Sequence, residues 1–427
     1  MQEPADHLTS VLAASAASAA SAASAAAAVH LRAKGQEDHE MTDFHPSPAP
    51  NSGLKIPLLD YLQLALLPVS LTWSLVQVTF RRTKNIGQNE IPFLKDYLLT
   101  IARAIPIPFS VSRILYTPKP TLESPRFRAH ASSIYQPVTH SRVAGYWLCR
   151  GAPGHAIEAR ESDIVLYYLH GGAYTTGSPA SLLPAVLRIA ELAAQRGITL
   201  SCFALQYSYA PEQVWPTQLH QAVAGYRYLL QQQEIPAARV AVLGESAGGH
   251  LALSMLVQMG AEGLAPPGRG LFLCSPWVDL ACTRGSYVRN RYRDFLSRAS
   301  LRVCGRQLFP DRDVSGDGAA GGPVVDFSAP DLPGGGVSWK GILPSRVWVS
   351  VGGDEVFLDE IVALKQSLES AGVVVEMEVE PGEVHVWQGV KDVFDVGKYL
   401  KMTGDVPEDL LPGARNIANA VLAEVRG

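Results

Sequence analysis

The sequence predicts an α/β protein with a mostly parallel, doubly wound sheet. From about Ser141 onward, short apolar runs alternate with longer amphipathic stretches of helical period. Strands buried on both faces of a parallel sheet read as continuous apolar runs, and the helices between them cover those faces. The predicted strands are 164–169, 200–207, 240–243, 271–275, 347–351 and 373–379, and two of the predicted helices are 184–197 and 217–233.

Composition favours a large folded unit and argues against several classes of protein. Of the 427 residues, 47% are hydrophobic and 18% are charged, which supplies enough apolar material for a large core. The net charge of −4 gives no electrostatic reason to expect a nucleic-acid partner. No cysteine pair has CxxC spacing, so we expect no disulfide framework and no zinc site, and the pattern suits a reducing compartment. The five cysteines are Cys149, Cys202, Cys274, Cys282 and Cys304.

Three regions follow one another along the chain. Residues 1–53 contain the tract AASAASAASAASAAAA at 13–28, which has no apolar stripe to bury, so we expect this leader to be disordered. Acidic residues precede the tract where a secretory signal would have basic ones, which argues against secretion. The first arginine is Arg32, which argues against a mitochondrial presequence. Residues 54–140 are expected to form an apolar segment with cap helices. Residues 141–427 form the α/β domain, with a cap or loop insertion at about 290–345.

The stretch YLQLALLPVSLTWSLVQVTF at 61–80 has two interpretations. Its twenty residues carry no formal charge, and a helix of that length can span a bilayer. In that case RRTK at 81–84 would face the cytoplasm. Six polar residues and Pro68 weaken that interpretation. The alternative, which we prefer, is an apolar helix that caps the core or contacts a membrane surface without crossing it.

Ser246 is the candidate nucleophile. VAVLGESAGGHLAL at 240–253 places it after a predicted strand and before a predicted helix, in the pattern G-x-S-x-G. Gly244 and Gly248 allow a sharp turn, and the helix N-terminus would stabilise a developing anion. A phosphate-binding loop would need a lysine that is absent here.

A second loop supplies candidate donors for an oxyanion. LHGGAYTTG at 169–177 follows the predicted strand 164–169 and could turn consecutive backbone N–H groups toward a substrate oxygen. The expected donors are the N–H groups of Gly172, Ala173 and Ala247. We expect His170 and Gly171 to orient the loop without reacting.

The acid and the base follow later strands. His385, in PGEVHVW at 381–387, is the histidine that follows both a serine and an acid in a loop after a late strand. Asp354 and Glu355 lie in VSVGGDEVFLDE at 349–360, where a strand gives way to a helix. Either carboxylate could orient His385, and we slightly prefer Asp354. This division of labour requires no metal and no organic cofactor.

These motifs resemble the hormone-sensitive-lipase-like branch of the α/β-hydrolases, the fold-3 carboxylesterases. HGGAY stands in place of HGGG, GESAGGHLAL in place of GDSAGGNLA, and PGEVHVW resembles the histidine loop. YSYAPEQVWP at 207–216 and SPWVDL at 275–280 are also typical of the branch. The resemblance covers about 140–395 and implies an α/β-hydrolase fold with an eight-stranded sheet, a helical cap and ester hydrolysis. The apolar 61–80 stretch is similar to fungal members, including steryl acetyl hydrolase-like proteins of the endoplasmic reticulum.

The expected activity is hydrolysis of a short-acyl ester of a hydrophobic alcohol, such as a sterol or a secondary metabolite. An amidase or a lactonase would use the same residues. A third hypothesis is a non-catalytic small-molecule receptor on the same fold, although such receptors typically lack the histidine that is present here. We expect the protein to be intracellular, in the cytoplasm or associated with the endoplasmic-reticulum membrane.

Overall fold

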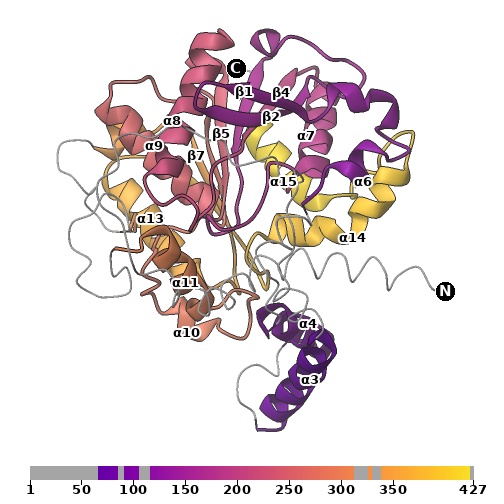
Figure 1. The fold of residues 1–427 in the computed structure, drawn as a ribbon, viewed down its shortest axis with the longest axis vertical. Coiled ribbons are helices and arrows are strands. Elements are labelled where there is room, and N and C mark those ends of the chain that lie inside the picture. Colours follow the sequence, from indigo (N-terminus) through magenta and orange to yellow (C-terminus); the bar gives the residue numbers. More distant parts are fainter. Residues whose placement is uncertain (1–65, 85–90, 105–115, 312–325, 329–337, 424–427) are drawn as a thin grey trace.

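An eight-stranded sheet forms the centre of the computed structural model, which describes residues 66–84, 91–104, 116–311, 326–328 and 338–423 (Figure 1). The strand order is β1-β2-β4-β3-β5-β6-β7-β8. Strand β2 runs antiparallel to both of its neighbours, and the other pairs are parallel. The strands are β1 Gln136–His140, β2 Val143–Arg150, β3 Ile164–Leu169, β4 Leu200–Leu205, β5 Val240–Glu245, β6 Gly270–Cys274, β7 Val347–Gly352 and β8 Val375–Glu380.

The structure confirms all six predicted strands and adds two more. The additional strands, β1 and β2, form the antiparallel edge of the sheet. Side chains of β1 are half-buried or exposed, so this strand lacks the continuous apolar run that marks a fully buried strand such as β3. The predicted leader, residues 1–53, lies outside the described residues, as do parts of the predicted 54–140 and 290–345 regions.

Helices cover both faces of the sheet, and alternating side chains of each strand point to opposite faces. In β3, Val165, Tyr167 and Leu169 belong to one buried cluster, whereas the intervening residues belong to the other. The first face is covered by α8 Thr217–Arg227, α9 Ala247–Ala261 and α13 Leu358–Ser370, and the second by α7 Leu183–Gln195, α14 Trp387–Lys401 and α15 Pro412–Leu422 (Figure 1).

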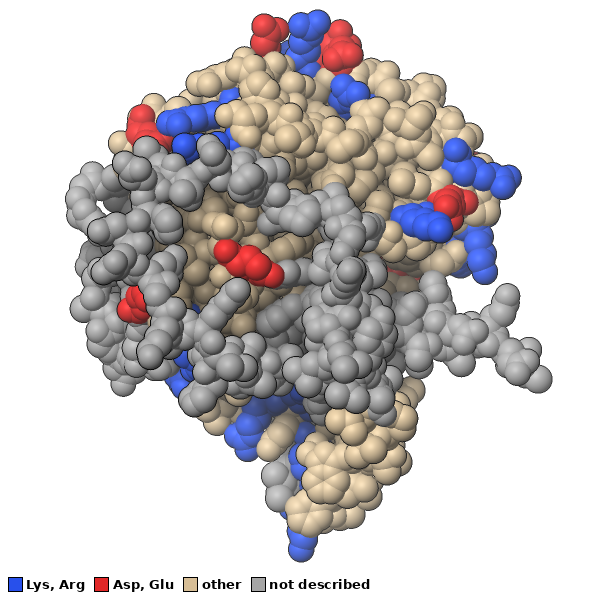
Figure 2. Space-filling model, in the orientation of Figure 1, with Lys and Arg blue, Asp and Glu red and all other residues tan. Residues whose placement is uncertain are grey.

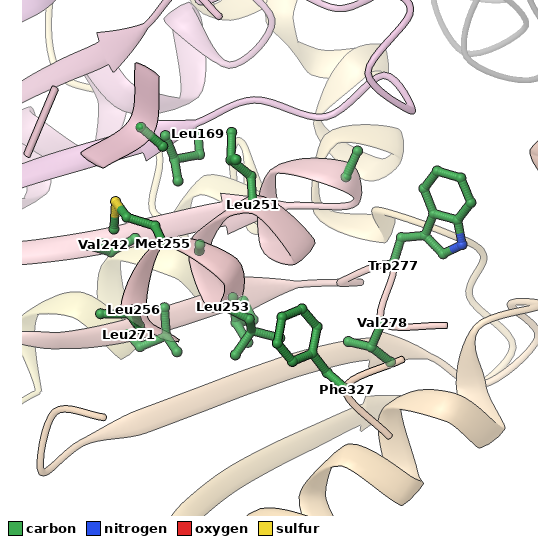
Figure 3. Packing of buried hydrophobic residues seen from close by; sticks show 14 of the residues in the cluster. Leu169, Val242, Leu251, Leu253, Met255, Leu256, Leu271, Trp277, Val278 and Phe327 are labelled. Atoms are coloured by element: carbon green, nitrogen blue, oxygen red, sulfur yellow. The ribbon is translucent and has the colours of Figure 1, made fainter. Parts of the chain in front are cut away.

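Helix α9 packs closely on the centre of the sheet (Figure 3). Its side chains Leu251, Met255 and Leu256 are fully buried in the same cluster as Leu169 and Val242 of the strands beneath. The predicted helix over 217–233 is divided in the structure. Its first part is α8, and a wider π-helical turn over Tyr228–Gln232 follows.

A hairpin of two helices projects from the body of the molecule (Figure 1). It consists of α3 Leu67–Thr83 and α4 Phe93–Ala104. Pro68 stands at the start of α3, where its missing N–H has no helical partner to lose, so it begins this helix instead of interrupting it. No helix among the described residues combines the length and the apolarity needed to cross a membrane.

The remaining helices are short, with the exception of α11. The remaining helices are α6 Lys119–Leu122, α10 Ser286–Arg289, α11 Arg298–Leu308, α12 Trp339–Ile342, and the 3-10 helices η2 Arg128–Ser133, η3 Ala159–Glu161 and η5 Ala237–Arg239. The described parts of 290–345 contain no strand of the sheet.

The contact between α9 and β3 depends on Gly248. A Cβ atom on Gly248 would lie 2.0 Å from the carbonyl oxygen of Leu169. We therefore expect Gly248→Ala to push α9 from the sheet and lower the free energy of unfolding by about 1–3 kcal/mol. Chemical denaturation of the purified variant measures this change.

Gly389 in α14 provides the matched control. A Cβ atom there meets no other atom within 4 Å. Gly389→Ala should instead raise the free energy of unfolding by about 0.5–1 kcal/mol, because alanine favours the helix. Equal effects of the two substitutions would contradict the steric explanation.

Candidate active site

Ser246 lies at the junction of β5 and α9 with an unusual backbone conformation. Its φ of 53° and ψ of −119° are sparsely populated by residues other than glycine. Its N–H donates to the carbonyl of Cys274, and its own carbonyl accepts from Trp277 N–H, each at 3.0 Å. These bonds to the neighbouring β6 segment hold the strained turn. The hydroxyl consequently lies at the carboxyl edge of the sheet and at the N-terminus of α9.

His385 lies beside Ser246, although 139 residues separate them in the sequence. Its Nε2 is 2.8 Å from the Oγ of Ser246. The imidazole is 1% exposed, and its edge-to-face neighbours are Phe357 and Phe295, at ring-centroid distances of 4.8 and 5.9 Å. The loop after β8 thus delivers the candidate base to the candidate nucleophile in a dry environment.

Glu355, and not Asp354, faces the other nitrogen of that imidazole. The Oε1 of Glu355 lies 3.4 Å from Nδ1 of His385, and the Glu355 side chain is fully buried. Asp354 turns away and pairs with Arg293 at 2.9 Å. The structure therefore differs from our preference for Asp354. The physical reason is that adjacent residues of the loop after β7 direct their side chains to different sides.

Ser275 is a site residue that the sequence analysis did not single out. Its hydroxyl donates to Oε2 of Glu355 at 2.7 Å and accepts from the N–H of Val386 at 2.9 Å. The N–H of Gly352 donates to the same Oε2 at 2.8 Å. Ser275 thereby links the acid loop to the histidine loop. The signal that could have identified it is its place at the start of SPWVDL.

Asp294 is a second residue that sequence reasoning missed. It is fully buried, and Oδ1 accepts from the N–H of His385 at 3.3 Å while Oδ2 accepts from the N–H of Val356 at 2.9 Å. Burial raises the pKa of Asp294 to about 6. Its carboxylate therefore connects the backbones of the two loops that carry His385 and Glu355. No motif in the sequence marks this position.

The loop after β3 lies directly over Ser246. A Cβ atom on Gly171 would be 3.2 Å from the Cβ of Ser246. Positive φ angles at Gly172, Ala173 and Tyr174 turn the backbone sharply. Within the described residues, neither the Gly172 N–H nor the Ala173 N–H donates to a protein acceptor. Ala247 begins α9, where N–H groups have no helical acceptor.

His170 is held behind this loop and remains neutral. Its Nδ1 lies 2.8 Å from the carbonyl oxygen of Gly171, and its ring stacks on Tyr207 at 4.1 Å. Burial lowers the pKa of His170 to about 4. The hydroxyl of Tyr207 donates to the His170 carbonyl at 2.8 Å. These contacts restrict the loop without bringing the imidazole to Ser246.

Glu245 places a further carboxyl group beside the site. Burial raises its pKa to about 7, although the charge of His385 and a weak 3.5 Å hydrogen bond from Tyr168 favour ionisation. A Cβ atom on Gly171 would lie 3.0 Å from its Oε1. Near neutral pH, this group is therefore divided between protonated and ionised forms. Among the described residues, no cluster of three or more His, Cys, Asp or Glu is arranged to hold a metal ion.

Comparisons with known proteins agree with this architecture. Residues 166–389 match a family described as having the alpha/beta hydrolase fold. An acetyl-hydrolase from Streptomyces hygroscopicus is 32% identical over a match covering 56% of this chain and 73% of that protein. An ethyl acetate hydrolase from Pseudomonas putida is 30% identical, covering 54% and 68%. A solved hormone-sensitive lipase from a metagenome library superposes with a TM-score of 0.51 at 25% identity, covering 67% and 84%.

The raised pKa of Glu245 has a consequence for stability. The folded protein binds this proton more tightly than the unfolded chain, so stability present at low pH is lost as pH rises from about 4.5 through about 7. Glu245→Gln removes this titration. We expect its unfolding free energy to fall less steeply than that of the wild type across this window, as measured by denaturation at several pH values.

Glu158→Gln is the control for the loss of one carboxylate, because Glu158 is exposed. It should retain the wild-type dependence of unfolding free energy on pH. Parallel curves for Glu245→Gln and the wild type would contradict the assignment.

Proposed function

The chain belongs to the α/β-hydrolase-fold family, among its hormone-sensitive-lipase-like esterases, and is a carboxylic-ester hydrolase; from that premise we propose that it cleaves a short-acyl ester of a hydrophobic alcohol through an acyl-enzyme on Ser246. A sterol or a secondary metabolite is the expected kind of alcohol. The short distance between Ser246 Oγ and His385 Nε2 carries this proposal, because the reaction begins with proton transfer between these two atoms.

The proposed reaction has two halves. In the first, Oγ of Ser246 bonds to the ester carbonyl carbon while Nε2 of His385 accepts the serine proton, and His385 then protonates the departing alcohol. In the second, His385 accepts a proton from water, which attacks the acyl-enzyme, and returns that proton to Ser246 as the carboxylic acid leaves. The N–H groups of Gly172, Ala173 and Ala247 are the proposed donors to the tetrahedral oxyanion in both halves.

Glu355 is the proposed third member of this triad. Its carboxylate lies beside Nδ1 of His385, where a negative charge stabilises the imidazolium and selects the reactive tautomer. Hydrogen bonds from Ser275 and Gly352 to its second oxygen keep the carboxylate oriented. The 3.4 Å separation is longer than a tight hydrogen bond, and we propose that it shortens when the histidine becomes charged.

The expected substrate class has two sources of support. The two relatives described above are an acetyl-hydrolase and an ethyl acetate hydrolase by name, which favours a short acyl group. The exposed apolar surface of α3 favours a hydrophobic alcohol. The resemblance of the apolar 61–80 stretch to fungal members is the reason that we propose a fungal type within the branch. Amide and lactone hydrolysis would use the same atoms, so a substrate panel distinguishes these activities.

Replacing the nucleophile tests the acyl-enzyme. Ser246→Ala should lower kcat for p-nitrophenyl acetate by about 10³-fold or more, since it removes the hydroxyl that forms the proposed covalent intermediate. A fluorophosphonate probe should label the wild type at Ser246, as located by peptide mass spectrometry. Full turnover by Ser246→Ala, or labelling at another residue, would disprove this mechanism.

The two neighbouring carboxylates offer a matched comparison. Glu355→Gln should lower kcat by about 10²- to 10⁴-fold, because the amide cannot stabilise the imidazolium. Asp354→Asn, which affects the ion pair with Arg293, should change kcat by less than about tenfold. Steady-state kinetics on both variants, with thermal unfolding as a check on folding, tests this expectation. A larger loss in Asp354→Asn would assign the acid role to Asp354.

A further inference from the structure

The projecting hairpin of α3 and α4 carries an exposed apolar stripe. Val69, Trp73, Val76 and Phe80 follow one another at helical spacing and are between 49% and 65% exposed. Such a regular series of large apolar side chains would ordinarily face a protein core. On this hairpin it faces outward, and the described residues leave it largely uncovered.

The inward side of α3 mixes polar and apolar residues. Ser74 is fully buried there, beside the equally buried Val78. The hydroxyls of Ser70, Thr72 and Ser74 each donate to the carbonyl oxygen four residues earlier in the helix, at 2.8–3.2 Å. These three hydroxyls are thus satisfied within the helix, which suits an apolar surrounding medium. Water-facing helices usually have the reverse distribution.

Charges at the base of the hairpin are predominantly positive. Helix α3 contains no acidic residue, and Arg81, Arg82 and Lys84 stand at its C-terminal end. The acidic residue in the described part of the hairpin, Asp96, is buried and paired with Arg81 and Arg82. Figure 2 shows a largely uncharged surface on the projecting hairpin, with Lys and Arg but no acidic side chain visible on it in this view.

We propose that the hairpin docks into the surface of a membrane that contains anionic lipid, with the apolar stripe of α3 in the acyl–headgroup boundary. The apolar stripe supplies the insertion. Arg81 and Arg82 share the single carboxylate of Asp96, so this end of α3 keeps a net positive charge, and exposed Lys84 adds to the match with anionic headgroups. The helix lies in the interface without crossing the bilayer. A second copy of this chain could also cover an apolar stripe, but it would bring the same positive charges together.

The position of the hairpin explains what docking would achieve. The ammonium group of Lys95 donates to the carbonyl of Gly382 at 2.6 Å, three residues before His385. Arg103 of α4 donates to the carbonyl of Asp294, whose carboxylate accepts from the N–H of His385. A docked hairpin therefore brings the active site to the lipid surface. Resting on the proposed function, this names membrane-dissolved esters as the substrates.

Trp73 is a natural probe of docking. It is 59% exposed, whereas the other six tryptophans, all within the described residues, are buried or half-buried. We expect its emission to shift to shorter wavelength, and acrylamide quenching to fall roughly twofold, with phosphatidylcholine vesicles containing 30% phosphatidylserine. Pure phosphatidylcholine vesicles should give a smaller effect. Trp73→Phe should abolish the change.

A matched pair of double variants tests the stripe itself. Val69→Ser with Trp73→Ser should reduce sedimentation with anionic vesicles by about tenfold. Val374→Ser with Phe394→Ser is the control, because these residues are 79% and 59% exposed but lie outside the hairpin. Vesicle binding of the control pair should equal that of the wild type. In the stripe variant, the ratio of turnover of a vesicle-borne ester to turnover of dissolved p-nitrophenyl acetate should also fall by about tenfold.

The outcomes separate this inference from the proposed function. Binding is measured in the Ser246→Ala background, so it does not depend on hydrolysis. Hydrolysis of dissolved ester without vesicle binding would overturn only the docking proposal. Vesicle binding together with a wild-type protein that hydrolyses no ester would overturn only the proposed hydrolase function. Equal binding to both vesicle types, or a dimer in light scattering that the stripe variant dissociates, would also overturn the docking proposal.

Discussion

The strained backbone of Ser246 is the constraint on which the rest of the site depends. A positive φ at a non-glycine residue is unfavourable. It persists here because the N–H of Ser246 donates to the carbonyl of Cys274, and the carbonyl of Ser246 accepts from the N–H of Trp277. The close contact of α9 with β3, which Gly248 permits, fixes the following helix. Together these contacts hold the hydroxyl in position, so the other groups can be arranged around one point.

Buried carboxylates organise the loops around that point. Glu355 contacts the imidazole of His385 and Asp294 accepts from its backbone N–H, and both carboxylates are fully buried. Each carboxylate accepts specific hydrogen bonds. Glu355 accepts from Ser275 and Gly352, and Asp294 accepts from backbone N–H groups. Two loops that follow different strands thereby behave as one rigid support for the imidazole. The contact of Arg103 with Asp294 extends this support to the N-terminal hairpin.

Much of the fold was predictable because its signals are local. Each buried parallel strand carries a continuous apolar run, and the strand–turn–helix around Ser246 is marked by its own glycines. Strand β1 escaped prediction, because an edge strand with exposed side chains has no such run. Strand β2 also lacks a continuous buried run, because its first half alternates buried and half-buried residues. Ser275 and Asp294 escaped for another reason. Their importance comes from bonds to residues 60 or more positions away, and no local pattern records them.

By itself, the sequence determined the α/β architecture and the short list of reactive groups, since both follow from residue types and their order along the chain. Only the tertiary structure decided which carboxylate meets His385. Asp354 and Glu355 are adjacent and chemically equivalent, yet the loop after β7 directs one to Arg293 and the other to Nδ1 of the imidazole. Side-chain direction in such a loop depends on the packing of distant segments, which is a property of the folded chain.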